Sequence, residues 1–186
     1  MKKSVVWILI AVLLVALISG AAFLYSKLSD DYEAQRLAEK QTDEAGDEES
    51  MKVPDFIVSD AEGNMVKLSD FKGKPIVLNF WATWCHYCKE GMPHFEEAYK
   101  KYPDVQFVMV NATDGVQETM DKAKDYIKSK NYTFDVYYDT MINAVRNYGV
   151  SGLPMTFFID RDFNLVTYAN GMINMQTLEK AINLIK

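Results

Sequence analysis

The sequence contains Ile76-Val77-Leu78-Asn79-Phe80-Trp81-Ala82-Thr83-Trp84-Cys85-His86-Tyr87-Cys88, and this stretch decides the fold. Its first half is an apolar run broken only by Asn79, which is typical of a central strand covered on both faces. Both cysteines of the chain follow directly. We expect a helix over 85–102, kinked by Pro93, to begin at the first of them. A strand that leads two cysteines into a helix N-terminus indicates an α/β domain.

Outward from this stretch, apolar patterns with strand and helix periods alternate along the chain. The predicted helices cover 116–129, 141–148 and 175–185, and the predicted strands cover 105–110, 134–138, 155–159 and 164–169, with a hairpin of 56–58 and 65–67 before them. Alternating strands and helices imply a largely parallel sheet, and the adjacent final strands imply an antiparallel edge. The expected fold class is therefore α/β, with a central mixed sheet flanked by helices, in one domain over 53–186.

The first 52 residues differ in composition from the rest. No charged residue occurs from Val5 to Tyr25, and a helix of this length spans roughly 31 Å, about the thickness of a bilayer's hydrocarbon core. Lys2 and Lys3 precede the run and the following chain is acidic, so the positive-inside tendency sends the domain across the membrane. We predict a single-pass transmembrane helix over 1–25, an acidic linker over 26–52 and an extracytoplasmic domain.

A cleaved signal peptide is the alternative for this segment. Ser19-Gly20-Ala21-Ala22 offers small residues near the end of the run. The apolar core of a signal peptide is typically about 7–15 residues, however, and here the run continues to Tyr25. We therefore favour an uncleaved signal-anchor.

The charge and the length of the chain limit its partners. The formal net charge is −6 and no face rich in Lys and Arg is evident, so there is no electrostatic basis for binding nucleic acid. The sequence has room for one domain and shows no dimerisation domain. We expect a monomer.

Cys85 and Cys88 are three residues apart at the predicted start of a helix. Residues i and i+3 lie on the same helical face, so the two sulfurs can reach bonding distance. Unpaired N–H groups and the positive end of the helix dipole favour a thiolate at Cys85. We expect Cys85 to be the exposed nucleophile and Cys88 to be the buried resolving cysteine. The redox-active disulfide between them is then the redox group, and no separate cofactor is expected.

Two noncatalytic interpretations of the cysteine pair are weaker. A stabilising disulfide that closes a four-residue loop contributes roughly 2 kcal/mol, against about 4.7 kcal/mol for a loop of ~100 residues. A zinc site would need His86 and His94 beside the cysteines. Because His94 lies about two helical turns further along, the four ligands would not easily converge. We expect redox chemistry and no metal.

Several ordered motifs connect this interpretation to a family. They are Pro54-Asp55-Phe56, Leu68-Ser69-Asp70-Phe71-Lys72-Gly73-Lys74-Pro75, Val77-Leu78-Asn79-Phe80-Trp81-Ala82-Thr83-Trp84-Cys85 and Tyr148-Gly149-Val150-Ser151-Gly152-Leu153-Pro154-Met155-Thr156-Phe157-Phe158-Ile159-Asp160. From about Val53 to the C-terminus, the chain resembles the TlpA/ResA-like family of membrane-anchored bacterial thioredoxin-like proteins. The resemblance implies a thioredoxin fold with an insert over about 116–138. It also implies that the protein reduces the disulfides of exported proteins, often apocytochrome c during cytochrome c maturation, and is itself reduced by a membrane thiol-reductant donor.

The resemblance further implies a set of residues around the cysteines. Pro154 matches the family proline whose peptide bond is cis beside the active site. The backbone of Leu153 would then lie opposite Cys85, where it can pair with an extended substrate and exclude metal from the thiols. An ordinary trans proline that opens an edge strand is the alternative. Supporting or substrate-binding roles are expected at Trp84, His86, Tyr87, Glu90, Leu153 and Pro154.

The sequence departs from the family pattern at three places. Asn79 stands where thioredoxin has a buried aspartate, and an amide cannot accept a proton as a carboxylate does. The family glutamate three residues after the second cysteine is replaced by Gly91, with Glu90 one position early. One residue turns a helical side chain by about 100°, so Glu90 is only a candidate base. Tyr87 replaces a frequent proline, and a protonated His86 would stabilise the neighbouring thiolate and make the disulfide more oxidising.

Four other functions are open at this point. A disulfide-forming oxidase or an isomerase would use the same fold. A thiol peroxidase shares Pro54-Asp55-Phe56 and Gly73-Lys74, but it needs a threonine three residues before its reactive cysteine, and this chain has Ala82 three residues before Cys85. A noncatalytic, membrane-tethered binding module would tolerate loss of the cysteines.

Overall fold

The computed structural model describes residues 51–186. The predicted transmembrane helix over 1–25 lies outside the described residues, as does all but the end of the predicted linker over 26–52. Within residues 51–186, no helix combines the length and the apolar character that crossing a bilayer requires. The described residues thus correspond to the predicted domain over 53–186 and the two residues before it.

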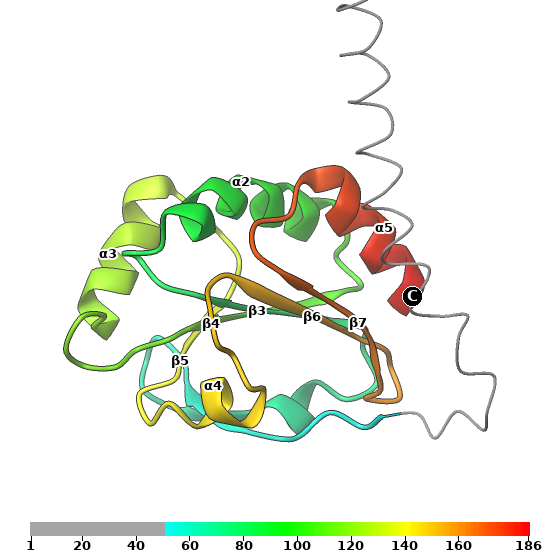
Figure 1. Ribbon diagram of the computed structural model, residues 1–186, viewed down its shortest axis with the longest axis horizontal. Helices are drawn as coiled ribbons and strands as arrows, with labels where there is room; N and C mark the ends of the chain where they lie inside the picture. Colours follow the sequence, from blue (N-terminus) through cyan, green and yellow to red (C-terminus); the bar gives the residue numbers. More distant parts are fainter. Residues whose placement is uncertain (1–50) are drawn as a thin grey trace, which may run out of the picture. The chain divides into compact units, whose positions relative to one another are not determined.

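A seven-stranded sheet forms the centre of the described domain, in the strand order β2-β1-β5-β4-β3-β6-β7 (Figure 1). The strands are β1 (Ile57–Ser59), β2 (Met65–Lys67), β3 (Ile76–Trp81), β4 (Gln106–Asn111), β5 (Val136–Tyr138), β6 (Met155–Ile159) and β7 (Leu165–Asn170). The helices are α2 (His86–Lys101), α3 (Met120–Lys130), α4 (Asn143–Asn147) and α5 (Met175–Ile185), and the 3-10 helix η1 (Leu68–Phe71) follows β2. The predicted mixed α/β sheet with an N-terminal hairpin is confirmed.

β3 occupies the middle of the sheet, and all six of its residues are buried. It pairs in parallel with β4 over its whole length and antiparallel with β6 on its other side. Successive apolar side chains of β3 enter two different clusters, one on each face of the sheet. Because both faces are covered, this strand is a continuous apolar run in the sequence.

The sheet is less parallel than the alternation of elements predicts. Of its six strand pairings, only β3–β4 and β4–β5 are parallel. The prediction of a largely parallel sheet is wrong because α4 has five residues, about 7.5 Å, and cannot carry the chain back along the sheet before β6. β6 therefore begins at the end of the sheet where β3 finishes, and Met155 pairs with Phe80 there.

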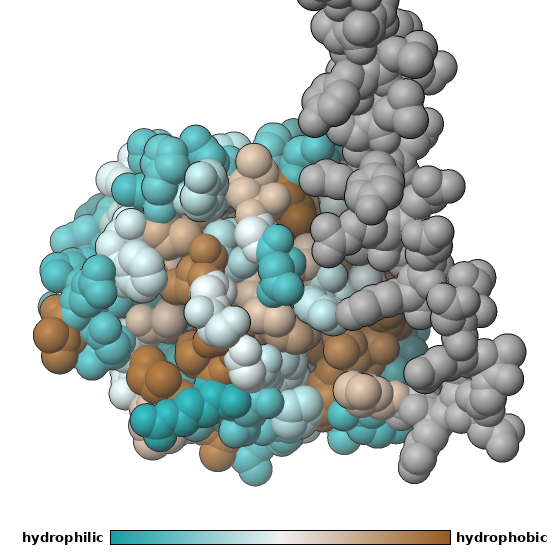
Figure 2. All heavy atoms as spheres, in the orientation of Figure 1, coloured by the Kyte–Doolittle hydropathy of each residue, from teal (hydrophilic) through white to brown (hydrophobic). Residues whose placement is uncertain are grey.

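Two apolar layers cover opposite faces of the sheet (Figure 1). α2, α3 and α5 lie on one face and enclose a cluster that includes Trp81, Met92 and Leu178. α4, η1 and residues 53–56 before β1 lie on the other face, around Phe80 and Tyr148. In the same orientation, Figure 2 shows apolar side chains gathered in a band between α2 and α4, where the sheet lies.

α3 begins at Met120, four residues later than the predicted helix over 116–129. Asp114 Oδ1 accepts hydrogen bonds from the N–H groups of Val116 at 2.8 Å and Glu118 at 2.9 Å. These bonds hold 114–118 in a turn, and Thr119 then caps the helix with its side chain. The predicted boundary is wrong because the Asp114 carboxylate competes with the helix for these backbone N–H groups.

Candidate active site

Cys85 is the N-cap residue of α2, directly after the turn that follows β3. Its backbone is extended, with φ −78° and ψ 111°, and its N–H donates to the carbonyl of Ala82 at 3.2 Å. The N–H of Cys88 donates to Cys85 Sγ at 3.1 Å. A sulfur therefore takes the capping position that a Ser, Thr, Asp or Asn oxygen usually fills, and it faces the unpaired N–H groups of the helix.

Cys85 and Cys88 form a disulfide, and their Cα atoms are 5.3 Å apart. The i, i+3 spacing thus brings the two sulfurs together, as predicted. Both residues are buried, with exposed fractions of 6% and 3%. The expectation of an exposed Cys85 is wrong for the disulfide form, because its sulfur is bonded to Cys88 and both residues pack in the apolar cluster between α2 and the sheet.

Exposed aromatic side chains border the disulfide in the sequence. Trp84 precedes Cys85 and is 49% exposed, and Tyr87 precedes Cys88 and is 61% exposed. Trp81, by contrast, is fully buried, with its ring centroid 6.0 Å from that of Tyr126. Large apolar side chains that stay exposed next to a buried disulfide offer a contact surface for another molecule.

Glu90 pairs with His86 on the exposed face of α2. Its Oε1 lies 3.1 Å from His86 Nε2, and the side chains of His86 and Glu90 are 75% and 47% exposed. Cys88 and Gly91 are buried and lie on the opposite, inner face of the helix. The one-residue offset in the sequence therefore directs the Glu90 carboxylate to His86 and to solvent.

Gly91 occupies the position, three residues after the second cysteine, at which the TlpA/ResA-like family has a glutamate. A side chain at this position would begin 3.5 Å from Met172 Cγ and 3.7 Å from Phe95 Cε2. Both distances are ordinary van der Waals contacts. The space beside the inner face of α2 is therefore bordered by a thioether and an aromatic ring.

The peptide bond between Leu153 and Pro154 is cis, as predicted. Pro154 is buried and directly precedes β6, whose first residue pairs with the end of β3. Its carbonyl accepts a hydrogen bond from the N–H of Gly171 at 2.9 Å. Leu153 is half-buried and packs against both apolar clusters. The chain before β6 thus lies at the same end of the sheet as Cys85, and the segment after β7 is bonded to it.

Asn79 is buried in β3 and is neutral where thioredoxin has an acid. Its Nδ2 donates to Thr156 Oγ1 at 2.9 Å, which joins β3 to β6. It lies two residues from Val77 and two from Trp81 in the strand, so it shares their face, which α2 covers. This polar pair therefore lies within the layer that also holds the disulfide.

Glu118 is a site residue that the sequence reasoning missed. It is fully buried, and its carboxylate accepts hydrogen bonds from Thr83 N at 2.9 Å, Thr83 Oγ1 at 2.6 Å and Asn111 Nδ2 at 2.7 Å. Thr83 lies two residues before Cys85. A helix over 116–129 would place Glu118 in an exposed first turn, so the wrong helix boundary concealed it. An acidic residue directly before a threonine cap was the available signal.

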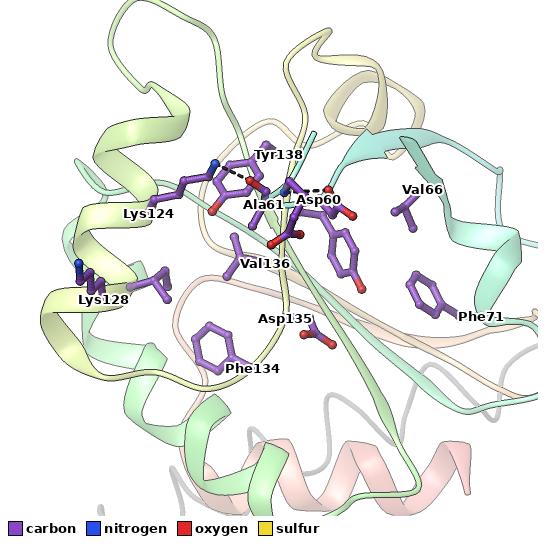
Figure 3. A pocket seen from close by; sticks show the side chains of 13 residues that line it. Asp60, Ala61, Val66, Phe71, Lys124, Lys128, Phe134, Asp135, Val136 and Tyr138 are labelled. Carbon is purple, nitrogen blue, oxygen red and sulfur yellow. Dashed lines mark hydrogen bonds between the residues drawn. The ribbon is translucent and has the colours of Figure 1, made fainter. Parts of the chain in front are cut away.

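A hollow of about 570 Å³ lies between α3, β5 and the hairpin of β1 and β2 (Figure 3). Its walls include Asp60, Phe71, Asp135 and Lys124, whose Nζ donates to the carbonyl of Ala61 at 2.6 Å. None of the residues that line it belongs to α2 or to the chain around Pro154. This hollow is therefore separate from the cysteine site. Within residues 51–186, no group of three or more His, Cys, Asp or Glu side chains is placed to hold a metal ion.

The chemistry of the site follows from these positions. Two cysteines share one disulfide at a helix N-terminus, where backbone N–H groups can stabilise a thiolate after the bond opens. A cis-proline segment lies at the same end of the sheet, and exposed aromatic side chains adjoin the cysteines in the sequence. This arrangement suits exchange between a dithiol and a disulfide.

Comparison with known proteins agrees with this chemistry. The profile of the AhpC/TSA family matches residues 50–168. The thiol-disulfide oxidoreductase ResA of Bacillus thuringiensis subsp. konkukian is 35% identical over 144 residues, which cover 74% of this chain and 81% of that protein.

Two solved structures have the same fold. The thiol:disulfide interchange protein DsbE of Chlorobium tepidum superimposes with a TM-score of 0.65 at 31% identity, over 72% of this chain and 94% of that one. StoA of Bacillus subtilis superimposes with a TM-score of 0.61 at 25% identity, over 69% of this chain and 96% of that one. The described domain thus has the thioredoxin-like fold that the sequence predicts.

Proposed function

Since this chain belongs to the AhpC/TSA family and is a thiol-disulfide oxidoreductase, we propose that it reduces the disulfides of exported proteins through Cys85 and Cys88. The disulfide between these residues at the N-terminus of α2 is the observation that carries the proposal. Apocytochrome c before haem attachment is the proposed substrate, on the basis of the resemblance to the TlpA/ResA-like family.

The proposed reaction has two exchange steps. The Cys85 thiolate attacks one sulfur of the substrate disulfide, forms a mixed disulfide and releases the other substrate sulfur as a thiolate. Deprotonated Cys88 then attacks Cys85 Sγ, and the second substrate sulfur leaves. One S–S bond breaks in the substrate and one forms in the enzyme. Two electrons pass to the substrate, and its thiolates take up the two protons that the enzyme thiols release.

The geometry of the helix terminus supports Cys85 as the attacking residue. Its Sγ already accepts the N–H of Cys88 at 3.1 Å, and the same N–H can stabilise the thiolate when the disulfide opens. The helix dipole adds to this effect and decays within the first turn. Cys88 lies inside that turn on the buried face of α2, which suits a residue that acts second.

Leu153 and Pro154 are proposed to align the substrate. The pairing of Met155 with Phe80 keeps the chain before β6 at the end of the sheet that carries Cys85. An extended substrate segment would pair with the backbone of Leu153 in the manner of an added strand. Trp84 and Tyr87 would cover the segment on its exposed side, because they offer apolar surface there.

Glu90 is proposed to act through His86 and not as a base for Cys88. The pair at 3.1 Å lies on the exposed face of α2, away from the inner face that holds Cys88. Both groups are exposed, so the interaction is screened by solvent and is worth at most about 1 kcal/mol. We propose that the Glu90 carboxylate slightly reduces the positive charge that a protonated His86 would place next to Cys85.

In the cell, we place the domain outside the cytoplasmic membrane. The predicted transmembrane helix over 1–25 would hold it there and the acidic segment over 26–52 would separate it from the membrane surface. A membrane thiol donor would reduce the Cys85–Cys88 disulfide after each turnover, and the domain would act as a monomer.

A disulfide-forming oxidase is the second candidate, and one residue favours it. His86 directly follows Cys85, and a protonated imidazole there would stabilise the thiolate and thus make the disulfide a stronger oxidant. The carboxylate of Glu90 at 3.1 Å offsets this charge, so the reductive direction is preferred.

The reduction potential and a turnover assay test the proposal. The full-length protein in detergent is equilibrated with thioredoxin and glutathione couples, and its disulfide fraction is measured. A reductant should lie near the roughly −270 mV of thioredoxin, whereas a value near about −120 mV would indicate an oxidase. Reduction of insulin should occur and should be lost in Cys85→Ser. A protein without turnover would instead be a noncatalytic binding module.

A further inference from the structure

Met172 lies in the short segment 171–174 between β7 and α5, and this segment is fixed on both sides of it. The N–H of Gly171 donates to the carbonyl of Pro154 at 2.9 Å, and Ile173 is buried in the core. Asn174 caps α5 by accepting the N–H of Thr177 at 2.9 Å. Met172 itself is 42% exposed. A backbone that is held in place therefore presents a flexible apolar side chain to solvent.

The side chain of Met172 reaches the helix that carries the disulfide. Its Cγ lies 3.5 Å from the point at which a Cβ on Gly91 would stand. Gly91 and Cys88 are three residues apart on the inner face of α2, so Met172 covers the helix within one turn of Cys88. Because Gly91 has no side chain, the side chain of Met172 packs directly over this part of the helix.

Met172 completes an apolar border around the cysteines. Trp84 and Tyr87 are exposed at the start of α2, and Met172 comes from a separate segment that is bonded to Pro154. Methionine is unbranched and polarizable, so it adapts its shape to different apolar partners. His86 and Glu90 pair on the exposed outer face of α2, and Lys89, directly after Cys88, is also exposed.

We infer that Met172 is a specificity-determining residue, which selects substrate disulfides that have an apolar side chain next to the attacked cysteine. The inference rests on the proposed function and names the kind of substrate for the same site. An apolar neighbour of the substrate cysteine would pack against the thioether while the disulfide meets Cys85. A charged neighbour would lose water against the thioether without gaining a charged partner from it.

Two disulfide-linked peptides that differ only in the residue next to one cysteine, leucine or glutamate, test this inference. The second-order rate of their reduction by the reduced full-length protein in detergent is divided by the rate with dithiothreitol, which removes differences in intrinsic reactivity. We expect a preference of about 5- to 10-fold for the leucine peptide, the size of a partly exposed apolar contact. Met172→Glu should abolish the preference, and Met172→Leu should keep it.

Met65→Glu is the matched control, because Met65 is an exposed methionine on β2 at the far edge of the sheet. It should leave the preference unchanged. An unchanged preference in Met172→Glu, or an equal loss in Met65→Glu, would overturn the inference. Dimerisation of the protein that disappears in Met172→Glu would also overturn it, since the patch would then bind a second copy. A protein that reduces neither peptide would instead contradict the proposed function.

Discussion

The Glu118 carboxylate accepts hydrogen bonds from both the backbone N–H and the hydroxyl of Thr83, at 2.9 and 2.6 Å. Glu118 is fully buried and also accepts the side-chain amide of Asn111 at the end of β4. Thr83 lies between β3 and the cysteine cap of α2. One buried acid in the turn before α3 therefore fixes the segment that positions Cys85.

Replacing Glu118 by alanine should destabilise the protein and slow its chemistry. The Thr83 N–H and the Asn111 amide would lose their acceptor in a buried place, and each such loss costs about 1–3 kcal/mol. We expect the free energy of unfolding to fall by about 2–4 kcal/mol in urea titrations of the oxidised protein. The rate of insulin reduction should also fall, because the segment before Cys85 is released.

Glu118→Gln and Glu97→Gln separate this role from a general effect of charge. Glutamine keeps the size of the side chain but has one acceptor oxygen, so we expect a loss of about 1–2 kcal/mol. Glu97 is exposed on α2, and its replacement should change the free energy of unfolding by less than about 0.5 kcal/mol. Equal losses in the two glutamine variants would contradict the assigned role of Glu118.

Cys88→Ser should trap substrates, whereas Cys85→Ser should not. The Cys85 thiolate of the first variant can still attack a substrate disulfide, but no second thiol is present to release the product. Non-reducing gel electrophoresis of the full-length protein with a disulfide substrate should show mixed disulfides that dithiothreitol removes. Cys85→Ser leaves only Cys88, which lies inside the first turn on the inner face of α2 and should give few or none.

The reactivity of the remaining thiol in each variant tests this difference in trapping. A small alkylating reagent should label the single thiol of Cys88→Ser faster than that of Cys85→Ser, by about tenfold or more if the helix terminus favours a thiolate. Similar trapping and similar labelling in the two variants would show that the two cysteines do not have distinct roles.

Most of the fold can be predicted from the sequence because hydrophobic periodicity is a local signal. The apolar run over 76–81 and the patterns over 65–67, 155–159 and 175–185 match the observed elements without any shift. The direction of β6 cannot be read in the same way, since it depends on the five residues of α4 and on where the chain turns. The start of α3 also depends on one side-chain turn at Asp114.

The same distinction between local and long-range signals applies to the residues of the site. The cysteine pair and the cis bond before β6 lie within contiguous motifs, so Cys85, Cys88 and Pro154 are found from the sequence. Glu118 and Met172 reach the site from segments that are distant in the chain, and only the folded structure brings them to Thr83 and Gly91. Pairwise contacts over such separations leave no pattern in a single sequence.

Glu96 should make the stability of the protein depend on pH. Burial raises the pKa of this carboxyl, but hydrogen bonds from Lys100 and from Thr133 outweigh burial, so its pKa is lower than usual. A lowered pKa gives stability that is present above the ordinary value of about 4.3 and is lost as the pH falls through the folded-state value. Glu96→Gln should therefore cost about 1–2 kcal/mol at pH 7 and almost nothing at low pH.

Urea titrations of both proteins between pH 7 and pH 3 measure this difference. Lys100 is exposed, so high salt should weaken only its part of the effect, and the bonds from Thr133 should persist. Lys100→Met is the matched variant and should remove the salt-sensitive part alone. A difference between wild type and Glu96→Gln that stays constant down to pH 3 would contradict this account.

Asn79→Asp should destabilise the protein at neutral pH and recover at low pH. The new carboxylate would be buried in β3 with the Thr156 hydroxyl as its partner, and no Lys or Arg of residues 51–186 is buried with it, which costs on the order of 3 kcal/mol. Burial raises the pKa of an acid in the folded state. The variant should therefore regain stability as the pH falls through that raised pKa, because the folded form then holds a proton that the unfolded form has lost.

Asn183→Asp is the control for the same chemical change, since Asn183 is exposed on α5. It should cost less than about 1 kcal/mol, the size of a charge at a helix C-terminus. Reduction potentials of the two variants then show whether an acid at position 79 acts on the cysteines. If Asn79→Asp is as stable as Asn183→Asp at pH 7, water reaches position 79 beneath α2. The prediction that burial makes a carboxylate costly at this position would then be wrong.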